Sequence, residues 1–375
     1  MSNTQSNLPT STAQTGQAIP MFSPTKELER IGYDNIQREM EKVLKSGTYI
    51  SGPGVVAFEE AAAEYMGTKY AIAVSSGTMA LELGLKAIGL SPKEPVTINA
   101  NTFVAVAEAI NAAGGTPDLV DTDPNNWQMP KVATSNIVLA SHLYGNASAA
   151  INSNTKLLME DASQSFGARL NGRLLGTFAP ITAVSLYPTK NLSANGDAGI
   201  IFTNNEDYAQ KCKALRNHGQ SGYQVHQYCG TTGRMDDLLA AVLKLKLAHF
   251  DSFLQERRHL AELYTQKLKG TPLQLPVIEP DLESATNLFV VRTAHRDALK
   301  QHLTERQIGC GIHYPTPIHQ MPAYTSLPWA QKSLPEAELL AQETLSLPIW
   351  VGMTEEQVTT VCNEVYRFFD ATERL

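Results

Sequence analysis

The stretch KYAIAVSSGTMALELGLKAIG, residues 69–89, sets a pattern that the chain repeats. KYAIAVSS is a short apolar run that predicts a strand, and TMALELGLKAIG has the apolar spacing of a helix. The chain turns from one into the other through Gly77, so backbone N–H groups at the helix start could bind a dianion, with Ser and Thr hydroxyls as further donors. Alone, SSGT at a helix start is more often plain capping.

Strand and helix patterns alternate on the C-terminal side of this stretch. Short apolar runs predict strands at residues 95–100, 117–121, 136–145, 156–161 and 181–187, and residues 102–115 have a helical pattern. Strands that are apolar on both faces and are spaced by helices indicate a parallel or mixed sheet covered on both sides. The fold class is therefore α/β, with one large three-layer domain at residues 21–250.

A second, smaller α/β domain is predicted at residues 251–375. Residues 234–268 carry apolar residues at helical spacing and predict one long bridging helix. A strand, a helix, a proline-rich loop and two C-terminal helices follow it. The first 20 residues are polar, lack the basic start and apolar core of a secretory signal, and predict a flexible tail.

Composition excludes several kinds of partner. The net charge of −7 comes without a run of like charges, which argues against nucleic acid or an anionic membrane as partner. No stretch approaches about 18 apolar residues, so we expect no membrane span. The four cysteines are far apart and have no metal-ligand spacing. We expect reduced thiols, no metal site and a cytoplasmic location.

Two side chains at predicted strand ends could carry chemistry. Asp161 ends the strand at 156–161, where open α/β sheets bind ligands, and could hold a pyridinium nitrogen protonated. A helix N-cap is an equally good interpretation. Lys190 follows the next strand in SLYPTKNLSANGDAG (185–199). Sheltered from water it would keep a free amine for Schiff-base formation, whereas the alternative is a solvated lysine on a turn. Ser185 could reach a phosphate, and Phe103 could stack on a heterocycle or simply fill the core.

In combination, the motifs resemble those of the DegT/DnrJ/EryC1/StrS sugar aminotransferases, which are pyridoxal-phosphate enzymes of fold type I. The resemblance runs from about residue 19 to residue 350. It rests on SGTMAL, ANTFVAVAEAI, DTDPNNW, HLYG, EDASQSFGA, SLYPTKNL with GDAG, GRMDDLLAAVL and IHYPTPIH, in this order.

The resemblance implies a role for each matching residue. Lys190 would bind pyridoxal phosphate as an imine, Asp161 would pair with the ring nitrogen, and Gln164 would bond the ring 3-oxygen. The other roles are stacking on the ring by Phe103, phosphate binding by Gly77, Thr78 and Ser185, and lining of the sugar-nucleotide pocket by Tyr187, His313 and Tyr314. The family also implies a homodimer with shared active sites, which His313 and Tyr314 could complete.

One segment departs from the family pattern. The family usually has G-x-N-x-R before the long helix, with its Asn reaching the phosphate of the neighbouring subunit's cofactor. Here the segment is GTTGR (230–234), so Thr232 stands in place of Asn. This puts the inter-subunit contact in doubt. Arg234 is kept, and it could order the loop, meet a substrate phosphate or form a surface salt bridge.

The expected reaction is transfer of an amino group from glutamate to a nucleotide-linked keto-sugar, giving an amino sugar for surface polysaccharide or a secondary metabolite. The context of Tyr187 favours a 3-keto-6-deoxyhexose on dTDP, with UDP as the second choice. A 4-keto-sugar or a cyclitol is an alternative substrate. A sugar 3-dehydratase is disfavoured because that enzyme carries histidine in place of Lys190. A non-catalytic nucleotide-sugar-binding or regulatory protein is the alternative of another class. SGPGVVAFE (51–59) lacks the third glycine of an NAD-binding turn.

Overall fold

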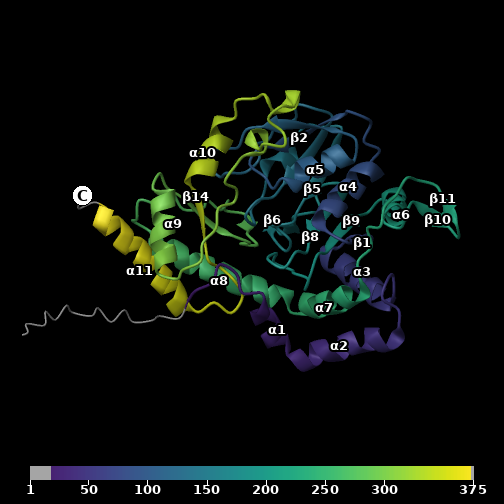
Figure 1. Cartoon of the computed structure of the whole chain (residues 1–375), viewed down its shortest axis with the longest axis horizontal. Coiled ribbons are helices and arrows are strands. Elements are labelled where there is room, and N and C mark those ends of the chain that lie inside the picture. Colours follow the sequence, from purple (N-terminus) through teal and green to yellow (C-terminus); the bar gives the residue numbers. More distant parts are fainter. Residues whose placement is uncertain (1–17, 373–375) are drawn as a thin grey trace, which may run out of the picture.

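The computed structural model describes residues 18–372, and a seven-stranded sheet forms the centre of that part of the chain (Figure 1). Its strands lie in the order β1-β9-β8-β5-β4-β2-β3. Their bounds are β1 Tyr70–Val74, β2 Pro95–Asn99, β3 Thr116–Val120, β4 Ile137–Ser141, β5 Leu157–Asp161, β8 Ile181–Ser185 and β9 Gly199–Thr203. Pairing is parallel from β8 to β3, whereas β9 is antiparallel to both of its neighbours. The predicted mixed, mostly parallel sheet is confirmed.

Helices cover both faces of the sheet, and successive side chains of a strand point to opposite sides, so each strand contributes to two cores. In β1, Ile72 and Val74 belong to the cluster under α4 (Gly77–Ala87), α5 (Ala105–Ala112) and α6 (Glu206–Leu215). Ala71 and Ala73 belong to the cluster on the opposite face, under α3 (Pro53–Met66) and α7 (Asp237–Ala248). Both clusters are almost fully inaccessible to water, and this arrangement gives the three predicted layers.

Strand β9 was missed by the sequence analysis, although it shapes the site. It pairs with β8 so that Ser185 lies opposite Gly199. A Cβ at Gly199 would lie 2.2 Å from the carbonyl oxygen of Ser76, at the start of α4. Only glycine allows this approach. Apolar runs such as GIIFT carry no mark of strand direction, which explains why the antiparallel pairing was not foreseen.

The single long helix predicted at residues 234–268 is wrong. The structure has α7 followed by α8 (Phe250–Leu268), and His249 between them leaves helical geometry, with φ −106° and ψ 0°. Helix α7 packs against α3 on the sheet, whereas the C-terminal part of α8 joins a separate apolar cluster. The apolar spacing continues across the break because both helices bury a face, so periodicity alone could not reveal it.

The remaining C-terminal elements enclose their own core. Side chains of α8, α11 (Glu355–Thr372), α9 (Arg296–Glu305), β13 (Phe289–Arg292) and β14 (Thr344–Leu347) form that cluster. Ile19 from the N-terminal segment is buried in it and bridges to Ile308. Of the predicted tail at residues 1–20, residues 1–17 lie outside the described part of the chain. Within the described part, no helix is both long and apolar enough to cross a bilayer.

Smaller elements complete the chain. Helices α1 (Thr25–Ile31) and α2 (Tyr33–Ser46) lie along α7, and the hairpin of β10 (Gln220–Gly222) and β11 (Val225–His226) projects from the body beside α6 (Figure 1). The others are β6 (Arg169–Leu170), β7 (Arg173–Leu174), β12 (Leu282–Glu283), α10 (Pro335–Glu343) and the 3-10 turns Ala149–Asn152, Ile318–Gln320 and Pro328–Ala330. Helices α10 and α11 match the two helices predicted at the C-terminus.

Candidate active site

A cavity of about 430 Å³ opens at the carboxyl edge of the sheet. This is the edge at which open α/β sheets bind ligands, because several strand ends and helix starts meet there. Most of the residues singled out from the sequence line this one cavity: Gly77, Thr78, Phe103, Asp161, Gln164, Ser185, Tyr187, Lys190, His313 and Tyr314. Thr232 and Arg234 do not.

The start of α4 forms one end of the cavity. Ser76 caps the helix, accepting a hydrogen bond from the Met79 N–H at 3.1 Å. The amides of the first turn have no acceptor inside the helix, and the positive end of the helix dipole favours an anion in front of them. Ser185 lies directly against Gly77, where an added Cβ would come within 2.4 Å of the Ser185 Cβ. The predicted dianion site therefore has amides and a hydroxyl facing the same space.

The Asp161 carboxylate is held at the end of β5 by Ser163. The Ser163 hydroxyl donates to Asp161 Oδ1 at 2.5 Å, and its amide donates to the same oxygen at 3.1 Å. The hydroxyl in turn accepts from the Ser185 N–H at 2.9 Å. One carboxylate oxygen is thus oriented by the protein, which leaves Oδ2 to meet a donor in the cavity. The alternative of a simple helix cap is not supported, because no helix starts at Asp161.

Lys190 lies in a tight turn after β8, where its N–H donates to the Tyr187 carbonyl at 2.8 Å. Burial lowers the pKa of Lys190 from 10.5 to about 8, and the attraction of Asp161 opposes that shift only partly. Desolvation disfavours the charged ammonium more than the neutral amine. The share of Lys190 present as free amine near neutral pH is therefore larger than for an ordinary lysine, which favours a role as nucleophile.

Gln164 is fixed by two neighbours on opposite sides of its amide. The Tyr144 N–H donates to Gln164 Oε1 at 2.8 Å, and Gln164 Nε2 donates to the Tyr314 hydroxyl at 2.8 Å. The backbone donor identifies Oε1 as the acceptor, so the orientation of the amide is unambiguous. Burial, reinforced by Tyr144 and Asp161, raises the pKa of Tyr314, which keeps its phenol protonated.

Three further predicted residues surround the mouth of the cavity. The rings of Phe103 and Tyr314 lie 5.5 Å apart and tilted, and Phe103 is 49% exposed, so it is not a core aromatic. Tyr187 is 50% exposed. His313 forms a 2.8 Å hydrogen bond between Nδ1 and the Ser346 hydroxyl. Burial and the nearby Lys190 charge lower the pKa of His313 to about 4, so the imidazole is neutral at pH 7.

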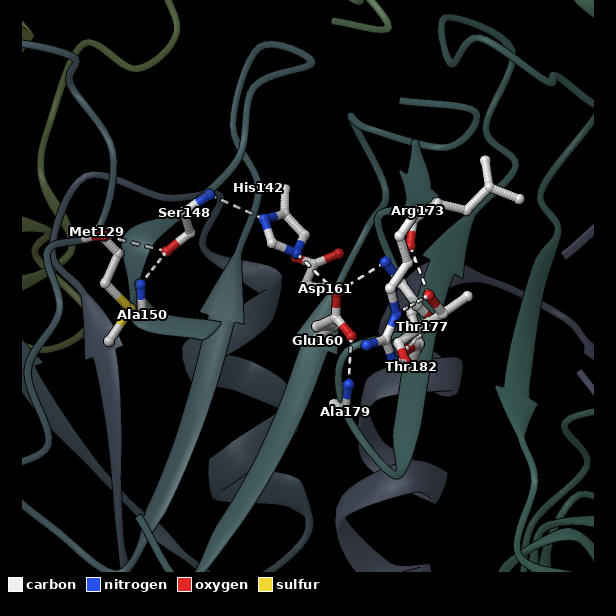
Figure 2. Close-up of polar contacts among 12 residues, drawn as sticks. Met129, His142, Ser148, Ala150, Glu160, Asp161, Arg173, Thr177, Ala179 and Thr182 are labelled. Carbon is white, nitrogen blue, oxygen red and sulfur yellow. Dashed lines mark hydrogen bonds and ion pairs between the residues drawn. The ribbon is translucent and has the colours of Figure 1, made fainter. Parts of the chain in front are cut away.

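A buried pair that no sequence pattern indicated lies beside Asp161 (Figure 2). The side chains of Glu160 and His142 are wholly buried, with 3.0 Å between His142 Nε2 and Glu160 Oε1. His142 Nδ1 accepts from the Ser148 N–H at 3.0 Å, so the proton sits on Nε2. Glu160 also accepts from the amides of Gly176 and Ala179 at 2.7 and 2.6 Å. His142 lines the cavity, and this network fixes its ring.

The GTTGR segment lies outside the cavity. Thr232 and Arg234 line a neighbouring cavity, and Asp197 borders both. The Thr232 hydroxyl is 3.2 Å from His218 Nε2. Arg234 Nη1 donates to Asn217 Oδ1 at 2.7 Å, whereas its Nε is buried and has no partner in the described chain. A salt bridge of Arg234, one of its three predicted roles, does not occur among the described residues.

Comparisons with known proteins agree with this geometry. The model of the DegT/DnrJ/EryC1/StrS aminotransferase family matches residues 31–366. Over 92% of this chain and 96% of the relative, the sequence is 35% identical to a Streptomyces venezuelae dTDP-3-amino-3,4,6-trideoxy-α-D-glucose transaminase. It is 36% identical to a dTDP-3-amino-3,6-dideoxy-α-D-galactopyranose transaminase from Aneurinibacillus thermoaerophilus, covering 89% and 95%.

Solved structures give the same picture. The structure of DesV from S. venezuelae in complex with a ketimine intermediate matches with a TM-score of 0.90 and 34% identity, covering 95% of this chain and 99% of that one. NtdA from Bacillus subtilis with bound PMP matches with a TM-score of 0.82 and 27% identity, covering 93% and 83%.

One sequence relative has a name of another kind. A Geobacillus stearothermophilus protein named a pleiotropic regulatory protein is 34% identical, covering 94% of this chain and 98% of the relative.

Proposed function

This chain belongs to the DegT/DnrJ/EryC1/StrS aminotransferase family, and on that basis we propose that it transfers an amino group from glutamate to a nucleotide-linked keto-sugar. One observation carries the proposal. Lys190, Asp161 and the start of α4 line a single cavity. Together they supply an amine, a carboxylate and an anion site, which is the set that a phosphorylated pyridine aldehyde requires.

The cofactor of this enzyme is pyridoxal phosphate, and the residues of the cavity fit it. The first turn of α4 with Ser185 would hold the phosphate, and the absence of a side chain at Gly77 lets Ser185 lie against this turn. The free oxygen of Asp161 would accept from the ring nitrogen, and the exposed face of Phe103 would stack on the ring. Thr102 Oγ1 and Ser141 Oγ, which also line the cavity, are buried without a partner in the described chain.

When bound, the cofactor supplies an electron sink that stabilises negative charge on the carbon next to the amine. The protein supplies the groups that keep this sink effective. Asp161 would hold the ring nitrogen protonated, and Ser163 orients the carboxylate by bonding its Oδ1. Lys190 would bind the cofactor through its amine and, when free, would carry the proton during the transfer. Its lowered pKa of about 8 suits both tasks.

Amination at C3 of a dTDP-linked 6-deoxyhexose is the preferred form of the proposal. The two dTDP-sugar relatives are both transaminases of 3-amino sugars by name. Tyr187, His313 and Tyr314 ring the cavity mouth, and we propose that they contact the sugar nucleotide. The neutral His313 at pH 7 would accept or donate one hydrogen bond without adding positive charge.

We also propose that two copies form a dimer that shares active sites. Several large apolar side chains are exposed on α2 and α3 and between them, including Leu44, Ile50 and Val56. Tyr223 at the tip of the β10–β11 hairpin is 91% exposed, and Arg234 has an unpaired buried nitrogen. A partner subunit would cover the exposed apolar side chains and could accept a hydrogen bond from the Arg234 Nε. Sedimentation of the purified protein tests this directly.

The four free thiols suit a reducing compartment, so we propose a cytoplasmic location, where nucleotide sugars and glutamate occur. A regulator is the competing function, because one relative is named as such. The lysine and carboxylate placed in one cavity favour the enzyme.

A substrate panel tests the proposal. Purified protein is incubated with glutamate and either a dTDP-3-keto- or a dTDP-4-keto-6-deoxyhexose, and mass spectrometry follows the exchange of oxygen for an amino group. We expect amination of the 3-keto compound and an imine absorbance that disappears on addition of glutamate. Amination of the 4-keto compound alone would overturn the choice of carbon, and a colourless protein inert to both would overturn the function. Lys190→Ala protein is the matched control.

A further inference from the structure

Asn287 connects the C-terminal part of the chain to the turn that carries Lys190. It lies just before β13, is 3% exposed and lines the cavity. Its Nδ2 donates to Asn191 Oδ1 at 2.7 Å and to the Thr189 carbonyl at 3.3 Å. One amide nitrogen carries two hydrogens, so both bonds can form together. Asn287 therefore holds the residues on either side of Lys190.

The orientations of both amides follow from their carbonyl partners. Asn191 Nδ2 donates to the Ala285 carbonyl at 2.5 Å, which makes Asn191 Oδ1 the acceptor for Asn287. The bond from Asn287 to the Thr189 carbonyl likewise requires a nitrogen on Asn287. A carbonyl cannot donate, so neither amide can be flipped without losing hydrogen bonds. The pair is a directional lock in which Asn287 acts as the donor.

Asn287 is itself held rigidly from behind. Its N–H donates to the Tyr144 carbonyl, and the Ala285 N–H donates to the Gly145 carbonyl, both at 3.1 Å. A Cβ at Gly145 would lie 2.4 Å from the Thr286 nitrogen, so this approach requires glycine. The amide of Tyr144 in turn binds Gln164. Residues 284–288 thus tie the Lys190 turn to the loop that orients Gln164.

We propose that Asn287 is a positioning residue that sets the orientation of the Lys190 side chain from outside its own loop. This inference rests on the proposed function, because Lys190 matters as the residue that binds the cofactor. If the turn were released, the amine could swing toward water. It would then lose part of the desolvation that favours its neutral form, and it would meet the cofactor less often at the right angle.

Two substitutions separate a directional lock from simple space filling. Asn287→Ala removes the donor and leaves the two oxygens free to bind water. Asn287→Asp keeps the size but places a carboxylate against Asn191 Oδ1 and the Thr189 carbonyl, which repel it. A lock predicts that the Asp variant is worse than the Ala variant. Space filling predicts the reverse order, because the Asp side chain has almost the same shape as Asn.

The first readout uses protein without cofactor. Labelling of Lys190 by an amine-reactive reagent, followed by peptide mass spectrometry across pH, gives the midpoint at which the amine becomes reactive. We expect a midpoint near pH 8 in the wild type, from the lowered pKa of Lys190. The midpoint should move toward the ordinary lysine value of 10.5 in the Ala variant. In the Asp variant the new carboxylate raises the midpoint by its charge alone, so the order of the two variants is taken from the second readout.

The second readout is the rate at which the imine absorbance grows after pyridoxal phosphate is added. We expect a fall of about tenfold in the Ala variant and about 10²-fold in the Asp variant, the size of a misplacement of roughly 1 Å. An order in which Asp is as good as Ala or better, or an unchanged labelling midpoint, would overturn the proposal. A wild type that forms no imine would instead refute the proposed function, while the labelling result still decides on the lock.

Leu303→Ala is the matched control for general destabilisation. Leu303 is fully buried in the C-terminal cluster, away from the Lys190 turn. We expect this variant to lower the melting temperature and to leave the labelling midpoint of Lys190 where it is in the wild type. A midpoint that moves as far in the Leu303→Ala variant as in the Asn287→Ala variant would also overturn the proposal.

Discussion

The cavity at the carboxyl edge of the sheet and the GTTGR segment beside it were both singled out from the sequence, yet they differ in structure. In the cavity, side chains that act together are already oriented by each other: Ser163 holds Asp161, and Tyr144 holds Gln164. In the segment, the Arg234 Nε is buried without a partner in the described chain. The first site is organised by its own chain. Both regions leave buried polar atoms without a partner in the described chain, but in the cavity these are the neutral hydroxyls of Thr102 and Ser141, whereas in the segment it is a guanidinium nitrogen.

One chain orients the Asp161 and Gln164 side chains by itself, whereas within the described residues it leaves the Arg234 Nε unpaired. A buried donor without an acceptor costs about 1–3 kcal/mol, so an acceptor from outside the described chain would stabilise the Arg234 Nε. The proposed dimer would supply it. Four substitutions test this contrast: Lys190→Ala, Asp161→Asn, Gly77→Ala and Thr232→Ala.

Lys190→Ala should have the largest effect. Both the covalent link and the proton transfer depend on its amine, so the transamination rate should fall by about 10⁴-fold or more. Absorbance spectra and single-turnover kinetics measure the two losses separately. Circular dichroism should be unchanged, because Lys190 lies in a turn outside the helices and strands. Retained turnover with an imine absorbance would mean that another amine binds the cofactor.

Asp161→Asn should have the next largest effect. The neutral amide cannot hold the ring nitrogen protonated, so we expect kcat to fall by about 10²- to 10³-fold, as for loss of one preorganised electrostatic contact. The imine absorbance should still form, because Lys190 is intact. Stopped-flow kinetics with glutamate would measure the loss. A variant with normal kcat would show that the carboxylate does not act on the ring.

Gly77→Ala tests the start of α4. The added Cβ would lie 2.4 Å from the Ser185 Cβ, and overpacking of this kind costs about 1–3 kcal/mol. We expect the affinity for pyridoxal phosphate to fall by about ten- to 10²-fold, measured by titration of the cofactor-free protein. Gly222→Ala is the control, since an added Cβ there meets nothing closer than 3.8 Å. Equal losses in both variants would count against a phosphate site at α4.

Thr232→Ala should have the smallest effect. Among the described residues the Thr232 hydroxyl has one hydrogen-bond partner, His218 Nε2 at 3.2 Å, so stability should change by no more than about 0.5 kcal/mol. If the segment reaches the partner's cofactor, affinity for pyridoxal phosphate should fall by roughly two- to tenfold, the value of one neutral hydrogen bond. Thr232→Asn should raise it. Unchanged affinity in both variants would remove the segment from the active site.

Local patterns predicted a large share of the fold and of the site. The strand–glycine–helix stretch around Gly77 gave the right elements, because strand and helix periods and a turn residue lie within a few positions of one another. Asp161 and Lys190 could be singled out because each follows directly on a strand end. The other site residues were predicted from the resemblance of the surrounding motifs to the family. Ten of the predicted residues line one cavity: Gly77, Thr78, Phe103, Asp161, Gln164, Ser185, Tyr187, Lys190, His313 and Tyr314.

Contacts between distant segments could not be predicted. Asn287 reaches Asn191 across the chain, and no local pattern marks it as anything but a polar residue before a strand. Glu160 lies next to Asp161, yet its partners are set by the loop that carries Gly176 and Ala179. The break at His249 could not be predicted from the sequence for a related reason. Apolar spacing shows that one face of a helix is buried, but not which core that face contacts.

The pairing of Ser185 with Gly199 has a further consequence. The loop bearing Lys190 leaves and returns at one point, beside Ser76 and Gly77. The base of the Lys190 loop and the proposed phosphate site are therefore parts of a single hairpin and its adjoining helix, which fixes the separation of their backbones, whereas Asn287 acts on the orientation of the amine. The loops at the cavity mouth could lengthen or shorten over evolution while that separation stayed constant, which would let one scaffold accept many substrates without rebuilding its chemistry.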